Sequence, residues 1–193
     1  MPESTLDQLA GALADTATLV DGVGADQWGL PTPCSEWAVR EVVRHLVAGH
    51  YIFARAIEAQ PASAEGTSAV PNDQWSTAYR RSADVLLEAF ATPGALERPV
   101  TIPFGSVPGS VAFHLRLVEA LVHGWDVARA TGQAAPHDAG LAERELAWSK
   151  PWLAKVPADR SPFAPPLRVA DDASPLDRLV ACLGRDVTWG VAG

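Results

Sequence analysis

The stretch that decides the fold is LVEALVHGWDVARATG, from Leu117 to Gly132. Its Ala, Leu and Val content predicts a single helix, which Gly132 closes as a C-terminal cap. Glu119 and His123 are four residues apart, a rotation of about 40° at 3.6 residues per turn, so both leave the same helix face, and Asp126 lies there too. An unpaired buried polar group costs roughly 2–7 kcal/mol. This acid and this imidazole therefore need a partner, and a divalent metal suits both.

Composition excludes several classes of function. The chain has 193 residues, of which 48% are apolar, and this suits one domain or one domain with an appendage. A net charge of −8 without any basic run argues against a nucleic-acid or anionic membrane partner. The start lacks a signal-peptide pattern, and no apolar run approaches about 20 residues. Cys34 and Cys182 form no CxxC pair, which favours a reducing compartment. We therefore expect an acidic cytoplasmic protein.

Apolar periodicity predicts four long helices, over residues 4–22, 35–59, 72–91 and 110–131. Ser4 and Ser35 are the expected N-caps of the first two. A weaker helix is expected over 138–153. Further on, Ser174-Pro175-Leu176-Asp177 combines a capping box with proline at the first helical position, so it opens a short helix that stops at Gly184.

The connectors are too rich in proline for an extensive sheet. Only residues 99–107 suit a small β-ribbon, which would turn at Gly105. The sequence therefore predicts an all-α protein, a four-helix bundle with short extra C-terminal helices and this small ribbon. We expect the bundle to occupy residues 1–155 and a C-terminal extension, 156–193, to pack on it.

The second predicted helix offers a third candidate metal ligand. His45 falls on an apolar face of that helix, which can meet the Glu119–His123 face across the bundle core. Two imidazoles and a carboxylate, with a fourth position left to water, are the ligand set of an open zinc site, and iron or nickel fit it as well. The plainer alternatives are a core histidine bonded to a carbonyl, and a side-chain pair one helical turn apart.

Asp126 has two readings. It can accept a hydrogen bond from His123 and orient that ring, or it can be a solvated carboxylate or a partner of Arg129. Cys34 precedes the predicted helix start, where the dipole lowers a thiol pKa, but no base is near and a nucleophilic role is not favoured. The remaining candidates are assigned no chemistry: His50 is structural, His114 and His137 are surface or loop residues, and Trp37 and Trp125 are packing residues.

Three motifs carry a resemblance to a known family: TPCSEWAVREVVRHLVAGH, an FGS…PG loop, and EALVHGWDVARATGQ. Together they resemble the DinB-like superfamily. Within it the chain is similar to the actinobacterial group typified by the N-terminal domain of mycothiol-dependent maleylpyruvate isomerase. The ending DRLVACLGRDVTW is similar to an uncharacterised metal-binding branch. The resemblance covers essentially the whole chain.

The resemblance implies a four-helix bundle with one divalent metal, typically zinc, held by His45, Glu119 and His123. It also implies a low-molecular-weight thiol such as mycothiol, whose sulfur the metal activates. The isomerase has a separate C-terminal domain that contributes to its active site, whereas here only about forty residues follow residue 155. We therefore expect a metal-binding protein that uses mycothiol in S-transfer or isomerisation of a small electrophile. The alternatives are a non-catalytic metal-binding or ligand-sensing bundle, or a purely structural one. The sequence leaves open whether the chain is a homodimer.

Overall fold

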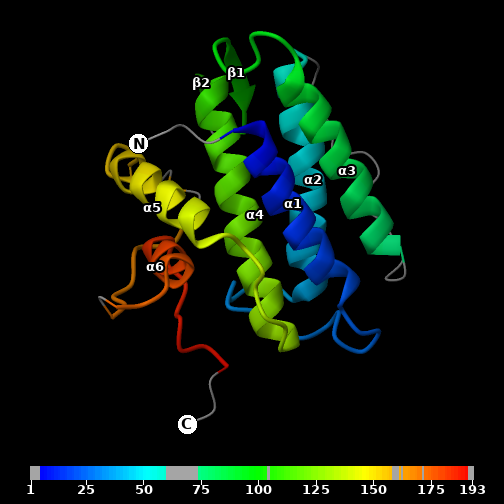
Figure 1. The fold of residues 1–193 in the computed structure, drawn as a ribbon, viewed down its shortest axis with the longest axis vertical. Helices are drawn as coiled ribbons and strands as arrows, with labels where there is room; N and C mark the ends of the chain where they lie inside the picture. The colour runs from blue at the N-terminus through cyan, green and yellow to red at the C-terminus, as the bar shows by residue number, and fades with distance from the viewer. Residues whose placement is uncertain are drawn as a thin grey trace.

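The computed structural model describes residues 5–59, 74–103, 105–157, 161, 163–170 and 172–190. Four long helices run alongside one another and form the bundle (Figure 1). Two short strands connect the third of these helices to the fourth, and two further helices follow the bundle. The elements are, in chain order, α1 (Leu6–Asp21), α2 (Val39–Ile57), α3 (Trp75–Ala91), β1 (Pro99–Ile102), β2 (Gly105–Pro108), α4 (Gly109–Thr131), α5 (Ala139–Leu153) and α6 (Pro175–Cys182).

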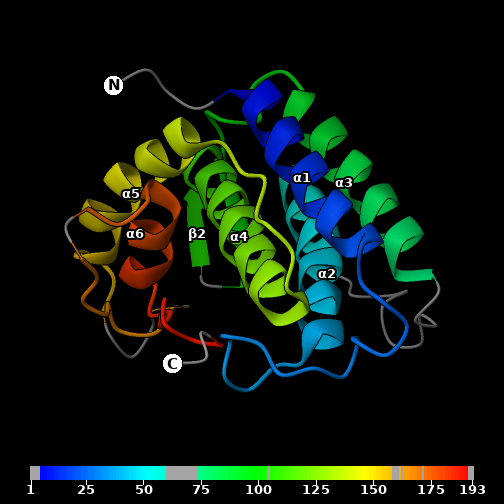
Figure 2. The ribbon, with the colours of Figure 1, turned by 60° about the horizontal axis from the view of Figure 1, so that its bottom comes forward.

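Helix α4 is the centre of the molecule. It packs against α1 and α2 on one side and against α5 and α6 on the other, as Figure 2 shows. Sixteen of its 23 residues are buried, so it has no broad polar face. A helix that is apolar nearly all round must be enclosed by other elements. The predicted all-α bundle is therefore confirmed, with the Glu119–His123 helix at its core.

The predicted β-ribbon is also present. Strands β1 and β2 pair antiparallel from Pro99 opposite Pro108 to Ile102 opposite Gly105. Val100 and Ile102 are buried, and β1 contacts both α2 and α4. The hairpin thus covers one end of these two helices. Among the described residues it is the only sheet.

Two predicted helix starts are wrong. Helix α2 begins at Val39 instead of Ser35 because the preceding residues form a non-helical loop. In this loop Pro31 and Ala38 form an isolated antiparallel β-bridge, and the Thr32 hydroxyl donates to the carbonyl of Trp37. Helix α1 is capped by Thr5, whose side chain accepts from Gln8 N while the Gln8 side chain accepts from Thr5 N. The predicted start of α3 at residue 72 lies outside the described residues.

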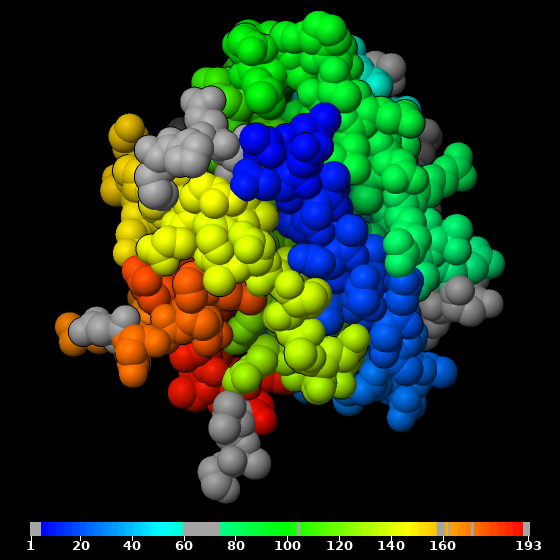
Figure 3. All heavy atoms as spheres, viewed as in Figure 1, coloured from blue at the N-terminus to red at the C-terminus, as the bar shows by residue number. Residues whose placement is uncertain are grey.

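The C-terminal helices begin where the sequence predicts. Asp138 caps α5, and Ser174 caps α6, with Pro175 in the first turn. The segment that leads from α4 to α5 runs along α1, where Thr16 Oγ1 lies 3.1 Å from His137 Nε2, and Figure 3 shows these segments in contact at the surface. Within the described ranges, no helix has the length and apolar character needed to cross a membrane.

Candidate metal-binding site

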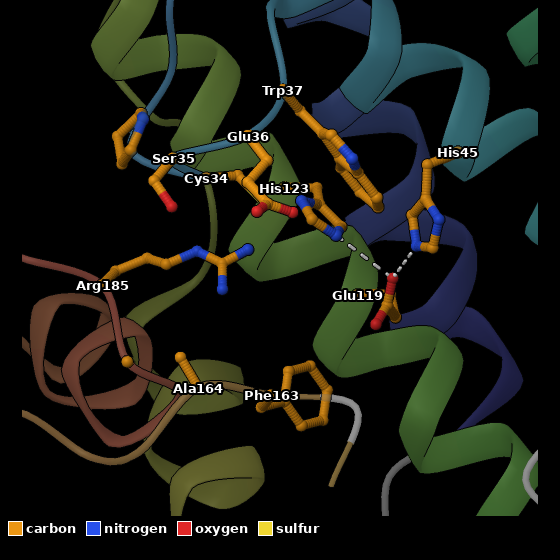
Figure 4. Close-up of a pocket in the computed structure, with 12 residues that line it drawn as sticks. Cys34, Ser35, Glu36, Trp37, His45, Glu119, His123, Phe163, Ala164 and Arg185 are labelled. Carbon is orange, nitrogen blue, oxygen red and sulfur yellow. Dashed lines mark hydrogen bonds and ion pairs between the residues drawn. The ribbon is translucent and has the colours of Figure 1, made fainter.

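Helices α2 and α4 bring His45, Glu119 and His123 together. The Nε2 of His45 lies 2.7 Å from Glu119 Oε2, and the Nε2 of His123 lies 3.3 Å from the same oxygen. Figure 4 shows both imidazoles directed at this carboxylate. The three residues that the spacing singled out therefore form one cluster, with Glu119 between the two histidines.

The donor atoms of the cluster suit a divalent cation. Each residue offers one ligand atom, and these atoms all lie within 4.8 Å of one another. Ligands about 2.0–2.1 Å from a tetrahedral zinc lie about 3.3 Å apart, which is the distance between His123 Nε2 and Glu119 Oε2. The residues present thus fit a metal of the zinc, nickel or iron kind.

The charges within the cluster stabilise one another. Burial on its own would raise the pKa of Glu119, but the two neighbouring imidazoles hold it well below its ordinary value. Burial likewise would lower the pKa of His123, but the carboxylates of Glu119 and Asp126 raise it above its ordinary value. Glu119 is consequently a carboxylate anion over the whole physiological pH range, as a metal ligand must be.

Asp126 orients the ring of His123. The Nδ1 of His123 donates to Asp126 Oδ2 over 2.9 Å, so its Nε2 is the nitrogen that faces Glu119. The alternative pairing of Asp126 with Arg129 is wrong. Arg129 donates instead to the carbonyls of Val187 and Trp189. The HGWD turn therefore directs its carboxylate to the imidazole three residues before it.

The C-terminal segment holds Asp126 from the other side. Arg185 Nε and Nη2 donate to its two carboxylate oxygens at 3.2 and 3.0 Å. Asp126 is fully buried, so this guanidinium compensates a charge that water does not reach. Trp125 Nε1 adds a second link, because it donates to Asp177 of α6. The segment beyond α6 is thus part of the site.

Trp37 packs on both imidazoles. Its ring centroid lies 4.6 Å from that of His45 and 5.7 Å from that of His123. Trp37 was predicted to be a packing residue, but the sequence did not indicate that it packs against the candidate ligands. An indole in contact with both rings limits their rotation, and it also excludes water from one side of the cluster.

A cavity of about 340 Å³ opens beside the cluster. Its walls come from three parts of the chain: the loop before α2, the facing sides of α2 and α4, and the C-terminal extension (Figure 4). A cavity of this size can hold a small organic molecule. The lining residues are Pro33, Cys34, Ser35, Glu36, Trp37, His45, Glu119, His123, Phe163, Ala164, Gly184 and Arg185.

Cys34 lies in the wall of this cavity as a neutral thiol. Burial raises its pKa to about 11, and although Arg185 opposes this, the nearby carboxylates add to it. The expected helix-dipole effect is absent because α2 begins five residues later, at Val39. Its sulfur nevertheless lies within 4.8 Å of ligand atoms of His123 and Asp126. The neutral thiol of Cys34 would therefore contact a molecule bound in the cavity.

The other histidines lie away from the cavity. His114 is wrongly predicted as a surface or loop residue: it lies within α4, and its Nδ1 is 2.9 Å from Oε2 of the buried Glu145. His137 is in a loop, as predicted, but it is buried against Thr16. His50 is structural, since it is fully buried and its Nδ1 lies 2.9 Å from a serine hydroxyl of α3.

Two arginines of the site were not predicted. Arg185 is 59 residues from Asp126 in sequence, and no local pattern relates them. Arg116 is buried one turn before Glu119, with 3.8 Å between Nη2 and Oε2. Two sequence features could have indicated that Arg116 belongs to the site: it lies three residues before Glu119, and the stretch around it is otherwise apolar.

Comparison with known proteins agrees with the architecture. The family model described as "Mycothiol maleylpyruvate isomerase N-terminal domain" matches residues 9–128. Two curated proteins from different strains of Mycobacterium tuberculosis, both described as uncharacterized, are each 36% identical over 175 residues, which cover 89% of this chain and 92% of the relative. This match to mycobacterial proteins supports the actinobacterial resemblance.

Two crystal structures share the fold, those of mycothiol-dependent maleylpyruvate isomerase and of a mutant of it. Each has a TM-score of 0.56 at 16% identity, over 74% of this chain and 66% of the isomerase chain. The chain thus spans about two thirds of the isomerase's length, and at this identity the likeness concerns the fold. The family match covers more than half of the chain and confirms the resemblance that the motifs indicated. The chain therefore belongs to the mycothiol maleylpyruvate isomerase N-terminal domain family.

Proposed function

We propose that this protein binds a divalent metal, zinc in the first instance, through His45, Glu119 and His123. We further propose that it uses a low-molecular-weight thiol, mycothiol, in S-transfer to a small electrophile or in its isomerisation. The observation that carries the proposal is the set of three ligand atoms within 4.8 Å of one another, beside a cavity of about 340 Å³. The family, named for a mycothiol-dependent isomerase, supports the choice of thiol.

A bound divalent ion would lower the pKa of a coordinated thiol and supply a thiolate near neutral pH. The residues of the chain prepare the site for this chemistry. Glu119 is ionised, and Asp126 holds the His123 Nδ1 proton so that Nε2 is directed at the cluster. Trp37 packs on both imidazoles, and the cavity leaves room for the thiol beside the cluster.

The alternative is a non-catalytic metal-binding or ligand-sensing protein with the same bundle. One observation favours it: the chain spans only 66% of the isomerase to which its fold is similar. The likeness therefore does not extend to the rest of the isomerase, nor to the activity of that whole protein. Both functions require the metal cluster, and they differ in whether a thiol and an electrophile react at it.

Metal analysis tests the site. Protein purified and dialysed without chelator is expected to contain one metal per chain, and His45→Ala is expected to lose it. Arg44→Ala is the matched control, because Arg44 is the preceding residue and is exposed. Metal well below one per chain, or metal content unchanged in His45→Ala, would defeat the proposed ligand set.

Thiol chemistry is tested on the cobalt-substituted protein. Mycothiol is expected to add a sulfur-to-cobalt charge-transfer band, and the protein is expected to accelerate the reaction of mycothiol with monochlorobimane, a small electrophile that fluoresces on thioether formation. A metal-loaded protein whose spectrum mycothiol leaves unchanged would favour the sensing alternative. A spectral change without rate acceleration would favour thiol binding without catalysis.

A further inference from the structure

A second cavity, of about 100 Å³, adjoins the metal cluster. It shares His45 and Glu119 with the larger cavity, and all its other lining residues are different. The two cavities therefore meet at these two side chains. The remaining residues of the small cavity are Ala48, Gly49, Ile52, Phe53, Pro103, Leu115 and Arg116.

Arg116 is the unexplained charge of this cavity. Its residue surface is 2% exposed, and neither Nε nor Nη2 has a hydrogen-bond partner. Glu119 Oε2 lies 3.8 Å from Nη2, which is beyond hydrogen-bond length, and that oxygen is already in contact with both imidazoles. A buried guanidinium is costly unless its N–H groups are bonded, and Arg116 has the Glu119 carboxylate nearby but no hydrogen bond at Nε or Nη2. Arg116 thus lines the cavity with two N–H donors, at Nε and Nη2, that no group in the described part of the protein accepts from.

Gly49 and Phe53 are the close neighbours of this guanidinium. A Cβ atom at Gly49 would lie well inside contact distance of Arg116 Nη1, so a larger residue there would displace the guanidinium from its present place. On another side, the ring of Phe53 lies 4.8 Å from the guanidinium carbon. Both neighbours line the same cavity. The guanidinium therefore occupies the space that Gly49 leaves open, against the face of Phe53.

The size and the walls of the cavity limit its ligand. About 100 Å³ corresponds to about three waters at roughly 30 Å³ each, and so to about four or five carbon and oxygen atoms. Ile52, Phe53 and Leu115 make the walls largely apolar. A planar guanidinium pairs best with a carboxylate, to which it can donate two parallel hydrogen bonds. A short apolar chain that ends in a carboxylate matches all three features.

We propose that the small cavity is the subsite for the carboxylate end of a short monocarboxylic acid, the electrophilic co-substrate, with Arg116 as the residue that selects it. This inference rests on the proposed function, in which the thiol occupies the larger cavity. An acid held by Arg116 would extend toward His45 and Glu119, where the two cavities meet. The two reactants would then approach the cluster from different sides.

Butanoate and its neutral isostere butanamide are the probes, with binding to the metal-loaded protein measured by calorimetry. We expect butanoate to bind and butanamide to bind at least tenfold more weakly. Arg116→Met keeps an unbranched, flexible stem and removes the guanidinium and its charge, and it should abolish the preference for butanoate. Ala48→Leu is the second variant, which leaves Arg116 in place and fills the cavity, and it should abolish butanoate binding.

The matched control is Ser35→Leu, since Ser35 lines only the larger cavity. It should weaken mycothiol binding and leave butanoate binding unchanged, the reverse of Ala48→Leu. Equal affinity for butanoate and butanamide would overturn the proposal. Loss of butanoate binding in Ser35→Leu with retention in Ala48→Leu would also overturn it.

Metal content, read on every variant, separates this inference from the proposed function. Normal metal and mycothiol binding without butanoate binding would overturn this inference alone. Absent metal, with butanoate binding that depends on Arg116, would overturn the metal-dependent function and support the carboxylate subsite. A third outcome combines two results: Arg116→Met loses metal, and Ala48→Leu binds butanoate as tightly as the wild type. It would overturn the subsite and show that Arg116 supports Glu119 in metal binding.

Discussion

The Nδ1 of His123 lies 2.9 Å from the Oδ2 of Asp126, a carboxylate that no solvent reaches. Arg185 donates to both oxygens of the same carboxylate. A continuous hydrogen-bonded path therefore runs from the segment after α6 to the imidazole that faces Glu119. It makes the orientation of a candidate metal ligand depend on the docking of the C-terminal segment.

Replacing Asp126 by Asn tests the role of this path in metal binding. The amide keeps the shape of the side chain but loses the charge that favours the His123 Nδ1–H tautomer. We expect metal affinity to fall about 10- to 100-fold, as loss of a ligand-orienting carboxylate typically causes. Competition with a chromophoric chelator measures it. The control is Asp84→Asn on the exposed surface of α3, which should bind metal normally; equal affinities in the two variants would contradict the orienting role.

Arg185→Gln should destabilise the fold as well as the site. It leaves the buried Asp126 carboxylate without its guanidinium, and removal of one partner from a buried ion pair costs about 3–5 kcal/mol. Urea unfolding measures this loss. Arg178→Gln is the comparison, because its pair with Glu143 is substantially exposed and should contribute less than about 1 kcal/mol. Similar losses in both variants would show that the Arg185–Asp126 pair does not anchor the segment.

Metal affinity should fall as the pH is lowered. Protons compete with the metal for His123, whose pKa the carboxylates of Glu119 and Asp126 raise above its ordinary value. Affinity is therefore greatest above that raised pKa and falls as pH drops through it, by about tenfold per pH unit for each proton displaced. Titrations with zinc at a series of pH values measure this. An affinity that stays constant from pH 8 to 5 would exclude two histidine ligands.

Fold stability should also decrease in mild acid, for a different reason. Burial lowers the pKa of His137 to about 4, whereas an unfolded histidine titrates near about 6.5. Above about pH 6.5, His137 is neutral in both the folded and the unfolded protein. Between about pH 6.5 and 4, the unfolded protein binds one more proton than the folded protein does, so the free energy of unfolding decreases as the pH is lowered. The loss from pH 7 to 5 is about 2 kcal/mol. The buried His50 adds a loss of the same sign.

Comparison of wild type with His137→Gln isolates this contribution. Urea unfolding at pH 7 and pH 5 is expected to show a smaller pH-dependent loss in the variant, because glutamine does not titrate. His50 remains in both proteins and cancels in the difference. An identical pH dependence in the two proteins would show that His137 can be protonated without cost in the folded state.

Cys34 should react slowly with alkylating reagents. Its pKa of about 11, against an ordinary 9.0, leaves about 100-fold less thiolate at neutral pH. Iodoacetamide labelling in a Cys182→Ser background, followed by mass spectrometry, measures the rate against an unfolded control in urea. Labelling as fast in the folded protein as in urea would contradict a buried, neutral thiol in the cavity wall.

Local sequence rules determined the framework of the protein. The apolar pattern of residues 117–131 with a following glycine predicts α4, whose end is confirmed by the left-handed Gly132, φ 73°. Ser174 and Pro175 likewise predict the start of α6. The four-residue spacing of Glu119 and His123 placed them on one helix face, and the apolar face around His45 indicated that it meets them across the bundle, as its contact with Glu119 confirms. Each of these rests on interactions within about one helical turn, which the sequence displays directly.

Tertiary structure decided which side chains meet across longer distances. Periodicity indicates which face of a helix is buried, but not which neighbour covers it. The pairing of Asp126 with Arg185 instead of Arg129, and the contact of His114 with Glu145, depend on how α5 and α6 pack against α4. The start of α2 at Val39 depends on the Pro31–Ala38 bridge, which outweighs the capping preference of Ser35. The sequence thus indicated the three candidate ligands. The residues that orient them and the two cavities beside them depend on the packing of distant segments.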